Sequence, residues 1–461
     1  MNNQAKTNQE FLENLIDQKQ VFLSFAAKIS PVNFNLLLNN FANKPDDVIY
    51  ISQPDKKFIF LSYDELALQS FEHNEFGLLK KEIDILRNKL ITNHNEYPKV
   101  KFPVFITVAK FPNSKSSDEW SDFGKIDFII PKIALFKNQD DYFILYNSLS
   151  ESFSGHENLN IILENQVDKI YKLESRLVSP SINKSKIKLI GESDSEQSWE
   201  RKVDDLLDLI NKREINKIVL SKRLQFICEN ELNWEFVFNE LNEKYSSCTN
   251  FLIKSNNAIF FGSSPELLAR FEGNQFFTEA LAGSIMRGKD TEEDILLEHQ
   301  LLKSLKNNFE HNFVINHISD SLKDFVELIE VDKNTIVKKF SNIQHLQTGI
   351  KGTLKKNISL FDTISPFFPT PAVCGIPRDK SVDLISKTEN FDRGLFAGLL
   401  GWLDCNGNGE FVVGIRSALL KNNTLNLYAG CGIVEGSDAN EEYEEISLKL
   451  QPILSLFDNA N

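Results

Sequence analysis

The sequence predicts an α+β fold, in which extensive antiparallel sheet is combined with long helices. Strand-like runs of β-branched and aromatic residues, separated by turn signals, fill much of residues 48–149 and return between residues 395 and 430. Neighbouring runs are joined by short connections, which suit antiparallel pairs. Stretches with helical spacing of apolar residues are interspersed with them, and this mixture is typical of a large α+β domain.

The length and composition are those of an ordinary globular protein. With 461 residues, the chain is long enough for one large domain or for two or three smaller ones. Hydrophobic residues make up 41% and charged residues 25%, and the formal net charge is −14. Because nucleic acids and anionic membranes bind basic surfaces, this acidic balance argues against both as partners.

Cysteine usage and hydropathy predict a soluble cytoplasmic protein. No two cysteines show CxxC or zinc-finger spacing and their number is odd, which favours reduced thiols. They are Cys228, Cys248, Cys374, Cys405 and Cys431. The first residues, MNNQAKTNQEF, lack the apolar stretch of a signal peptide. No run reaches the roughly 18 apolar residues that a membrane-spanning helix needs.

The first 190 residues are expected to form strands, a helix and a linker. Strands are expected over residues 48–52, 57–62, 102–111, 126–136 and 141–149. Residues 160–177 have the apolar pattern of a helix. The polar residues 179–197 are interpreted as a loop or linker. We therefore divide the chain into an N-terminal part, residues 1–190, and a C-terminal region, residues 195–457.

The C-terminal region has the same mixture of elements. Strands are expected over residues 214–223, 256–271, 275–284, 395–404, 409–420 and 424–430. Helices are expected over residues 199–210, 291–320 and 439–457. CNGNG, at residues 405–409, is a strong hairpin signal. In the second helix Leu297, Leu301, Leu305 and Phe309 recur every fourth position, which predicts one long helix with a buried apolar stripe.

Lys217 is an unusual residue for the strand EINKIVLSKR. The run Ile218–Leu220 is apolar on both faces, as in a strand that is buried on both sides. A buried ammonium group is costly unless it is paired or its pKa falls. Lys217 could instead begin the strand and extend its amine to water. The strand alone leaves both interpretations open.

Three charged residues share one face of the expected last helix. Glu442, Glu445 and Lys449 are spaced at i, i+3 and i+7. Two carboxylates one turn apart suit a hard cation such as Mg²⁺, which binds few carboxylates and keeps waters or substrate oxygens. A solvated acidic face has the same spacing, so a metal site and a plain surface are both compatible with it.

Other chemical motifs are weak or missing. Glu310 lies beside the apolar stripe of its helix, and the seven histidines never show zinc-ligand spacing. YAGCGIVEG has the spacing GxGxxxG, and only 25 residues follow Gly436, too few for a dinucleotide-binding fold. Gly430 and Gly432 are more simply explained as positions where backbone approaches a small ligand. The sequence contains neither GxSxG nor a Walker motif.

Together these stretches resemble the chorismate-utilising enzymes, which include anthranilate synthase component I, aminodeoxychorismate synthase, salicylate synthase and isochorismate synthase. The similarity covers residues 195–457, and its blocks follow the family's order. They are INKIVLSKR, FFGSSPELLAR, TEALAGSIMRG, FEHNF, IQHLQTGIKG, FPTPAVCGIPR, FDRGLFAGLLGW, GEFVVGIRSA and YAGCGIVEGSDANEEYEEISLKL. Residues 1–190 carry no matching block and are expected to complete the same fold.

The resemblance implies a fold and a ligand set. The fold would be a two-sheet sandwich with helices outside and the active site between the sheets. The ligands would be chorismate and Mg²⁺, with Glu310 and Glu445 holding the metal and Glu442 in its outer shell or bound through water. Arg416 and Lys449 match the cations that bind substrate carboxylates. Gly283, His345, Gly430 and Gly432 match other positions of the pocket.

The resemblance also implies two catalytic residues. Family members that add water to chorismate carry a lysine where Lys217 stands, whereas anthranilate synthases carry glutamine. Water is a poor nucleophile and needs a base, and a lysine can serve if burial lowers its pKa. Glu266, in SPELL, matches the general acid that protonates the departing ring hydroxyl, and its pKa should be raised for that task.

Single positions distinguish the branches of the family. Ala282 stands where aminodeoxychorismate synthases often carry a nucleophilic lysine. Ala372 and Phe396 stand where salicylate synthases carry threonine and tyrosine. These positions favour an isochorismate synthase, an isomerase that replaces the C4 hydroxyl by a hydroxyl at C2. Asn307 departs from the family, which often has an acidic residue there, so metal affinity is expected to be weaker.

Three alternatives remain open. A salicylate synthase would share the base and the acid but would also release pyruvate. An anthranilate synthase component would need ammonia or an amidotransferase partner, and Lys217 argues against it. An inactive paralogue is the third. We expect a monomer with no amidotransferase partner. The product's pathway, whether menaquinone, siderophore or salicylate biosynthesis, is not indicated by the sequence.

Overall fold

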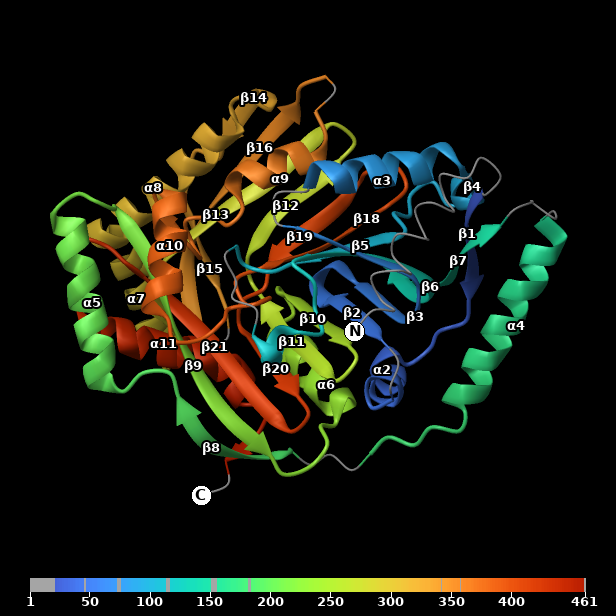
Figure 1. Cartoon of the computed structure of the whole chain (residues 1–461), viewed down its shortest axis with the longest axis horizontal. Coiled ribbons are helices and arrows are strands. Elements are labelled where there is room, and N and C mark those ends of the chain that lie inside the picture. Colours follow the sequence, from blue (N-terminus) through green and yellow to red (C-terminus); the bar gives the residue numbers. More distant parts are fainter. Residues whose placement is uncertain are drawn as a thin grey trace.

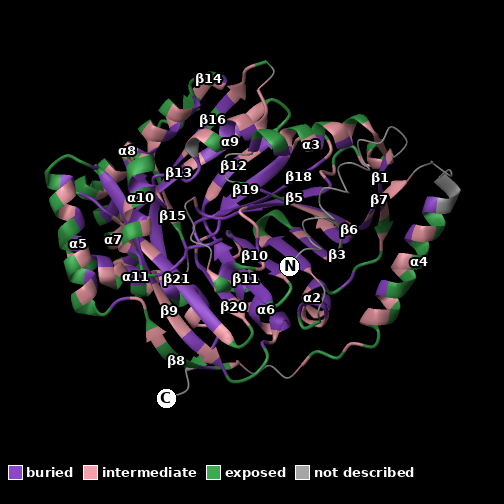
Figure 2. Ribbon diagram, in the orientation of Figure 1, coloured by how far each residue is buried: buried purple, intermediate pink, exposed green. Residues whose placement is uncertain are grey.

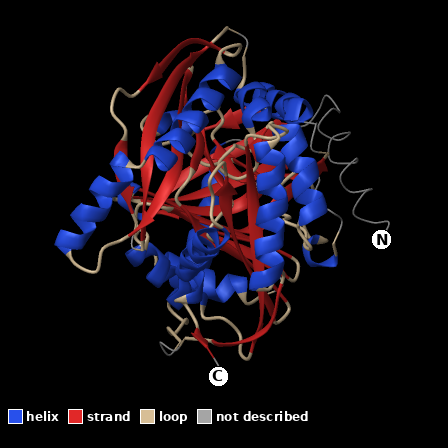
Figure 3. Ribbon diagram, turned by 90° about the vertical axis from the view of Figure 1, so that its left-hand side faces the viewer, coloured by secondary structure: helices blue, strands red, loops and turns tan. Residues whose placement is uncertain are grey.

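The computed structural model describes residues 21–44, 47–72, 76–112, 117–150, 156–180, 184–340, 342–356 and 358–459. Its strands form two large sheets that share the strand β6, Ile126–Asn138. Helices lie outside these sheets, as Figures 1 and 3 show. Except for β1–β4 and β22–β8, the strand pairings are antiparallel. The predicted fold class, an antiparallel α+β sandwich with outer helices, is therefore confirmed.

The first sheet begins with the C-terminal strand β22 and ends with strands from the N-terminal part of the chain. Its order is β22–β8–β9–β21–β20–β11–β10–β2–β3–β6–β7–β1–β4. The bounds are β22 Asp458–Asn459, β8 Lys186–Glu192, β9 Lys217–Cys228, β21 Thr424–Ile433, β20 Ser417–Lys421, β11 Ala258–Ser264, β10 Thr249–Ser255, β2 Val48–Gln53, β3 Phe58–Phe71, β7 Asp141–Ser150, β1 Val21–Ile29 and β4 Leu90–Thr92. The short β17, Gly375–Ile376, pairs with the start of β9.

The second sheet starts from the first residues of β6, where β5 pairs with residues 126–129 on the same edge that β7 follows along residues 133–138. Its order is β6–β5–β18–β19–β12–β13–β16, and β14 and β15 both pair with the far edge of β16. The bounds are β5 Phe105–Ala109, β18 Leu399–Leu403, β19 Gly409–Val413, β12 Leu267–Glu272, β13 Gln275–Met286, β16 Ile343–Leu354, β14 Val326–Val331 and β15 Ile336–Lys339. The pairing of β18 with β19 confirms the hairpin that CNGNG predicted.

Both sheets are covered by helices. Helices α5 and α11 contact the first sheet at β21, and α7 and α8 contact the second sheet at β13 and β16. The α-helices are α2 Phe34–Ala42, α3 Phe76–Asn88, α4 His156–Glu174, α5 Glu196–Asn211, α6 Trp234–Lys244, α7 Thr291–Lys303, α8 Leu305–Leu322, α9 Leu360–Phe367, α10 Arg378–Thr388 and α11 Ala439–Leu454. Among the helices of the described chain, none is long and apolar enough to cross a membrane.

Buried residues concentrate on the strands, while the outer faces of the helices are exposed (Figure 2). Phenylalanine supplies much of this core, and Phe102 lies edge-on to Phe136 and Phe143. Such edge-to-face pairs are a favourable arrangement of aromatic rings. Most of the described phenylalanines are therefore core residues, although Phe309 is exposed.

Two sequence predictions were wrong. Residues 291–320 form two helices, because Ser304 has extended backbone, ends α7 and caps α8 by accepting a hydrogen bond from the Asn307 amide. Leu305 and Phe309 are 88% and 63% exposed, so the expected stripe is not buried there. The expected linker also contains the strand β8, which pairs with β9.

Candidate active site

A cavity lies between the two sheets, with about 700 Å³ of empty space when its opening to solvent is included. It is lined from the first sheet by β9 and β21, and from the second by β13 and β16. Every site residue predicted from the sequence lines it, except Glu442 and Glu445. These lining residues are Lys217, Glu266, Gly283, Glu310, His345, Ala372, Phe396, Arg416, Gly430, Gly432 and Lys449.

Lys217 is buried at the first position of β9, and only 2% of it is exposed. Its Nζ donates to Oε1 of Glu310 on α8 over 2.7 Å. The interpretation in which this lysine extends to water is therefore wrong. Gly432 lies behind the pair, where an added Cβ would stand 2.8 Å from the Lys217 Cε and 3.0 Å from Oε1 of Glu310. A side chain at this position would therefore push the ends of Lys217 and Glu310 out of their present positions.

Glu266 lies between β11 and β12 and is 6% exposed. Its Oε1 accepts a hydrogen bond from the Thr370 hydroxyl over 3.1 Å. Burial raises the pKa of this carboxyl to about 7, with a smaller contribution from Glu279, while Thr370 and Lys217 oppose the rise. A carboxylic acid with such a pKa still carries its proton near neutral pH, as a general acid must.

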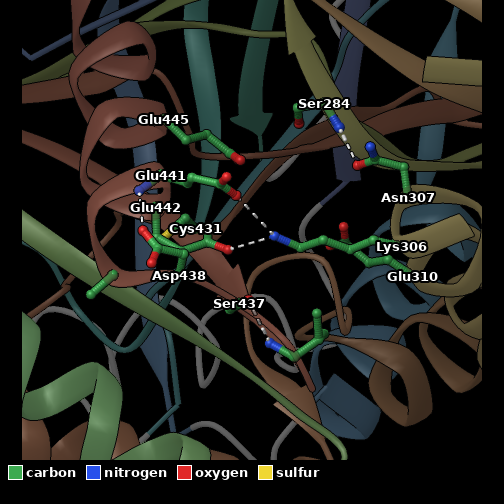
Figure 4. Close-up of polar contacts among 12 residues, drawn as sticks. Ser284, Lys306, Asn307, Glu310, Cys431, Ser437, Asp438, Glu441, Glu442 and Glu445 are labelled. Carbon is green, nitrogen blue, oxygen red and sulfur yellow. Dashed lines mark hydrogen bonds and ion pairs between the residues drawn. The ribbon is translucent and has the colours of Figure 1, made fainter. Parts of the chain in front are cut away.

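Two carboxylates project from α11 toward α8 (Figure 4). Burial raises the pKa of Glu442, and the neighbouring charge of Glu445 adds to this rise. Burial acts to raise the pKa of Glu445, but Lys449, whose Nζ lies 2.5 Å from it, together with Arg416 and Lys306 outweighs burial and lowers that pKa. Glu442 is buried, so the interpretation as a solvated acidic face is wrong for this residue.

A lysine on α8 faces the carboxylates of α11. Figure 4 shows Lys306 reaching from α8 toward Glu441 and Glu442, with Nζ 3.2 Å from Oε1 of Glu442. Lys306 is one turn before Glu310 on the same helix. Each carboxylate predicted to serve as a metal ligand therefore contacts a lysine: Glu310 contacts Lys217, Glu442 contacts Lys306 and Glu445 contacts Lys449.

The donor set fits a hard dication, although it is not preassembled. Carboxylate oxygens are the ligands that Mg²⁺ prefers. Burial, followed by repulsion from Glu445, raises the pKa of Glu442, and a cation would relieve this repulsion. Among the described residues, however, no three His, Cys, Asp or Glu side chains lie close enough to hold a metal ion. The side chain of Asn307 accepts a hydrogen bond from the Ser284 amide over 3.2 Å and so links α8 to β13.

One end of the cavity is cationic. Arg416 is 7% exposed and has a positive φ of 51°, and its Nη2 lies 3.3 Å from Nε2 of His345. Its Nη1 is buried and has no hydrogen-bond partner among the described residues. Burial lowers its pKa to about 10, so the guanidinium remains charged near neutral pH. Burial, followed by Arg416, lowers the pKa of His345, which keeps that imidazole neutral. This combination suits an anionic ligand group.

Three residues that matter to the site were not singled out from the sequence. Thr370 lies within the block FPTPAVCGIPR, Arg393 lies within FDRGLFAGLLGW, and Lys306 lies one helical turn before Glu310. Arg393 also lines the cavity and forms a buried bidentate pair with Glu389, with distances of 2.6 and 2.8 Å. The turn spacing to Glu310 was a signal that could have indicated Lys306.

The fold and this cavity define a member of a known enzyme family. The family model of the chorismate-binding enzymes matches residues 9–458, so the chain belongs to the chorismate-binding enzyme family. The predicted family is therefore confirmed.

Individual relatives are also similar over most of the chain. It is 32% identical to isochorismate synthase MenF of Bacillus subtilis over 344 residues, which are 75% of this chain and 72% of that protein. It is 28% identical to the salicylate biosynthesis isochorismate synthase of Pseudomonas aeruginosa over 436 residues, or 94% and 89% of the two chains. The solved structure of the menaquinone-specific isochorismate synthase MenF from Escherichia coli has the same fold, with a TM-score of 0.75, 22% identity and coverage of 98% and 100%.

Proposed function

We propose that this protein is an isochorismate synthase, which isomerises chorismate to isochorismate. The observation that carries the proposal is the presence of Lys217 and Glu266 in the wall of one cavity, with the acid's pKa raised to about 7. The relatives in Bacillus subtilis and Pseudomonas aeruginosa, both named isochorismate synthases, support the same activity.

The proposed reaction exchanges one hydroxyl group for another. Lys217 acts as a base only as the neutral amine, released from its ion pair with Glu310. Its Nζ then takes a proton from water as the water oxygen bonds to C2 of the ring. Both ring double bonds shift, from C1=C2 to C1=C6 and from C5=C6 to C4=C5, and the bond between C4 and its hydroxyl oxygen breaks. Glu266 gives its proton to that oxygen, so one water enters and one leaves. General acid and base catalysis together lower the barrier for a poor nucleophile and a poor leaving group.

The substrate's carboxylates would be held by the cationic end of the cavity. Arg416 has an unpartnered Nη1 within the described part of the chain, and Lys449 lies nearby with Nζ 2.9 Å from the Gly430 carbonyl oxygen. Mg²⁺ held by Glu310 and Glu445, with Glu442 as a further or water-mediated ligand, would bind the substrate's ring carboxylate as a Lewis acid. Ionic binding at fixed positions would orient the ring between base and acid.

The second candidate is a salicylate synthase. The base and the acid would be the same, and the enolpyruvyl group would then be eliminated as pyruvate. Ala372 and Phe396 line the cavity without a hydroxyl, whereas the salicylate synthases of the family carry threonine and tyrosine at these positions. This difference favours retention of the enolpyruvyl group, and hence isochorismate as the final product.

A product assay tests the proposal. Purified protein is incubated with chorismate and Mg²⁺, with and without ammonium, and the products are separated by chromatography and identified by mass. A product with the mass of chorismate and a new retention time, formed without pyruvate, is expected. Chelation with EDTA should stop turnover and added Mg²⁺ should restore it. Salicylate with pyruvate, or anthranilate that depends on ammonium, would contradict the proposal.

A further inference from the structure

Glu266, the predicted general acid, has a buried neighbour, Thr370, that takes no part in the proposed reaction steps. Thr370 lies in the loop between α9 and β17 and is 4% exposed. Within the described residues, the Thr370 hydroxyl donates its hydrogen bond to Oε1 of Glu266, over 3.1 Å. The Thr370 carbonyl oxygen accepts from the amides of Val373 and Cys374 over 3.1 and 2.9 Å, which fixes the loop. The hydroxyl therefore approaches the acid from a rigid support.

The rest of Glu266 is also held in place. Its amide donates to Oγ of Ser264 over 3.3 Å, and its carbonyl oxygen accepts from the Val413 amide over 3.2 Å. With the backbone and Oε1 both bonded, Oε2 is the carboxyl oxygen without a hydrogen-bond partner in the described residues. Since Glu266 lines the cavity, Oε2 is the oxygen that is free to act on a ligand there.

We propose that Thr370 is a positioning residue that engages Oε1 of Glu266 and so places the transferable proton on Oε2. A carboxylic acid has one proton and two oxygens that can carry it. An oxygen that accepts a hydrogen bond from a neighbouring hydroxyl is the carbonyl oxygen of the acid form. Thr370 thereby selects the protonated oxygen, and its bond also stabilises the carboxylate left after proton transfer. This inference rests on the proposed function, in which Glu266 is the acid.

The other charged and titratable groups around this carboxyl come from several elements. They are Lys217 on β9, Glu279 on β13, Lys338 on β15, His345 on β16, Arg416 before β20 and Lys449 on α11. A substitution of Thr370 changes none of these groups. A change in the titration of Glu266 in such a variant would therefore report the loss of the hydroxyl.

The test compares three variants of the full chain. Thr370→Val removes the hydroxyl at nearly constant size, and Thr370→Ser keeps it. Thr363→Val is the matched control, because Thr363 is fully buried and its hydroxyl donates to the Leu360 carbonyl oxygen instead. Protonation of Glu266 is followed by infrared difference spectroscopy of the carboxyl group against Glu266→Gln, which needs no turnover. The pH profile and the separate kcat and KM values are measured in parallel.

In Thr370→Val the pKa of Glu266 should rise by about one pH unit, because a hydrogen bond to the carboxylate is lost. The alkaline limb of the pH profile of kcat should also move to higher pH. On the acidic side of this limb, kcat should fall about 10-fold, while KM stays within about 2-fold of the wild-type value. Thr370→Ser should restore the titration and most of kcat, and Thr363→Val should match the wild type.

Two results would overturn the proposal: an unchanged titration of Glu266 in Thr370→Val, or a Thr370→Ser variant that behaves like the valine variant. If Thr370→Val fails to fold by circular dichroism, Thr370→Ala provides the same comparison with a smaller side chain. If the wild-type protein makes no isochorismate but Thr370→Val still raises the pKa of Glu266, the positioning role stands and only the proposed function is refuted.

Discussion

The contact between Lys217 and Glu310 gives the most decisive prediction. Lys217→Met keeps a long apolar side chain but removes the ammonium that lies 2.7 Å from the Glu310 carboxylate. The two side chains are 3% and 16% exposed, so the pair is largely screened from water. Breaking a buried pair by removing one partner costs about 3–5 kcal/mol. Because water still reaches part of Glu310, we expect a loss near the lower value, about 3 kcal/mol.

Removing both charges separates stability from catalysis. In Lys217→Met/Glu310→Gln no uncompensated charge is left, so most of the lost free energy of unfolding should return. Activity should not return, because the base is missing. Loss of a general base lowers the rate by about 100- to 10,000-fold, and we expect both variants to fall in this range.

The assay combines urea denaturation with measured isochorismate formation. Lys380→Met is the matched control, since Lys380 forms an ion pair of 2.8 Å with Glu214 in which both side chains are more than two-fifths exposed. Such a solvent-exposed pair contributes little to stability. The reasoning fails if Lys217→Met is as stable as Lys380→Met, or if either Lys217 variant retains wild-type turnover.

Three further predictions follow from the same site. Because burial raises the pKa of Glu266 to about 7, the proton-donating form is present below this pH, and kcat should fall as the pH rises through about 7. Gly432→Ala should abolish turnover in the product assay while the protein stays folded, because the new Cβ would stand 2.8 Å from the Lys217 Cε. Lys306→Gln should bind Mg²⁺ about 2- to 5-fold more tightly by calorimetry, because a partly exposed cation that competes for Glu442 is removed.

Each of these predictions has a contrary outcome, and the glycine substitution has a matched control. For the pH profile, a rate that increases steadily above pH 7 would mean that the protonated carboxyl of Glu266 is not required. Gly77→Ala is the control for Gly432→Ala, because an added Cβ at Gly77 meets nothing within 4 Å. Equal losses in the two alanine variants would contradict the steric argument. Unchanged or weaker Mg²⁺ binding in Lys306→Gln would show that this lysine does not compete with the metal.

Strands with a strong local pattern were predicted, whereas β1, β10, β14, β15 and β16 were missed and the long helical region was predicted as one helix. The strands β2, β5 and β21 follow runs of apolar and β-branched residues whose pattern is local. The helix break at Ser304 depends on one residue with extended backbone inside a continuous helical pattern. The Ser304 hydroxyl acts as a cap only once the break exists, so the local pattern does not reveal it. The same limit applies to β8, a polar segment that becomes a strand because β9 offers an edge. The division at residues 190–195 stays a prediction.

The sequence by itself determined the family, through ordered blocks around Lys217, Glu266, Glu310 and Glu445. It also determined most strands and the residue types available to the site. Only the tertiary structure decided how these residues are paired. Lys217 and Glu310 are 93 positions apart, and Glu266 and Thr370 are 104 positions apart. Neither contact has a local signal, because each forms where separate strands, loops and helices meet across the cavity between two sheets.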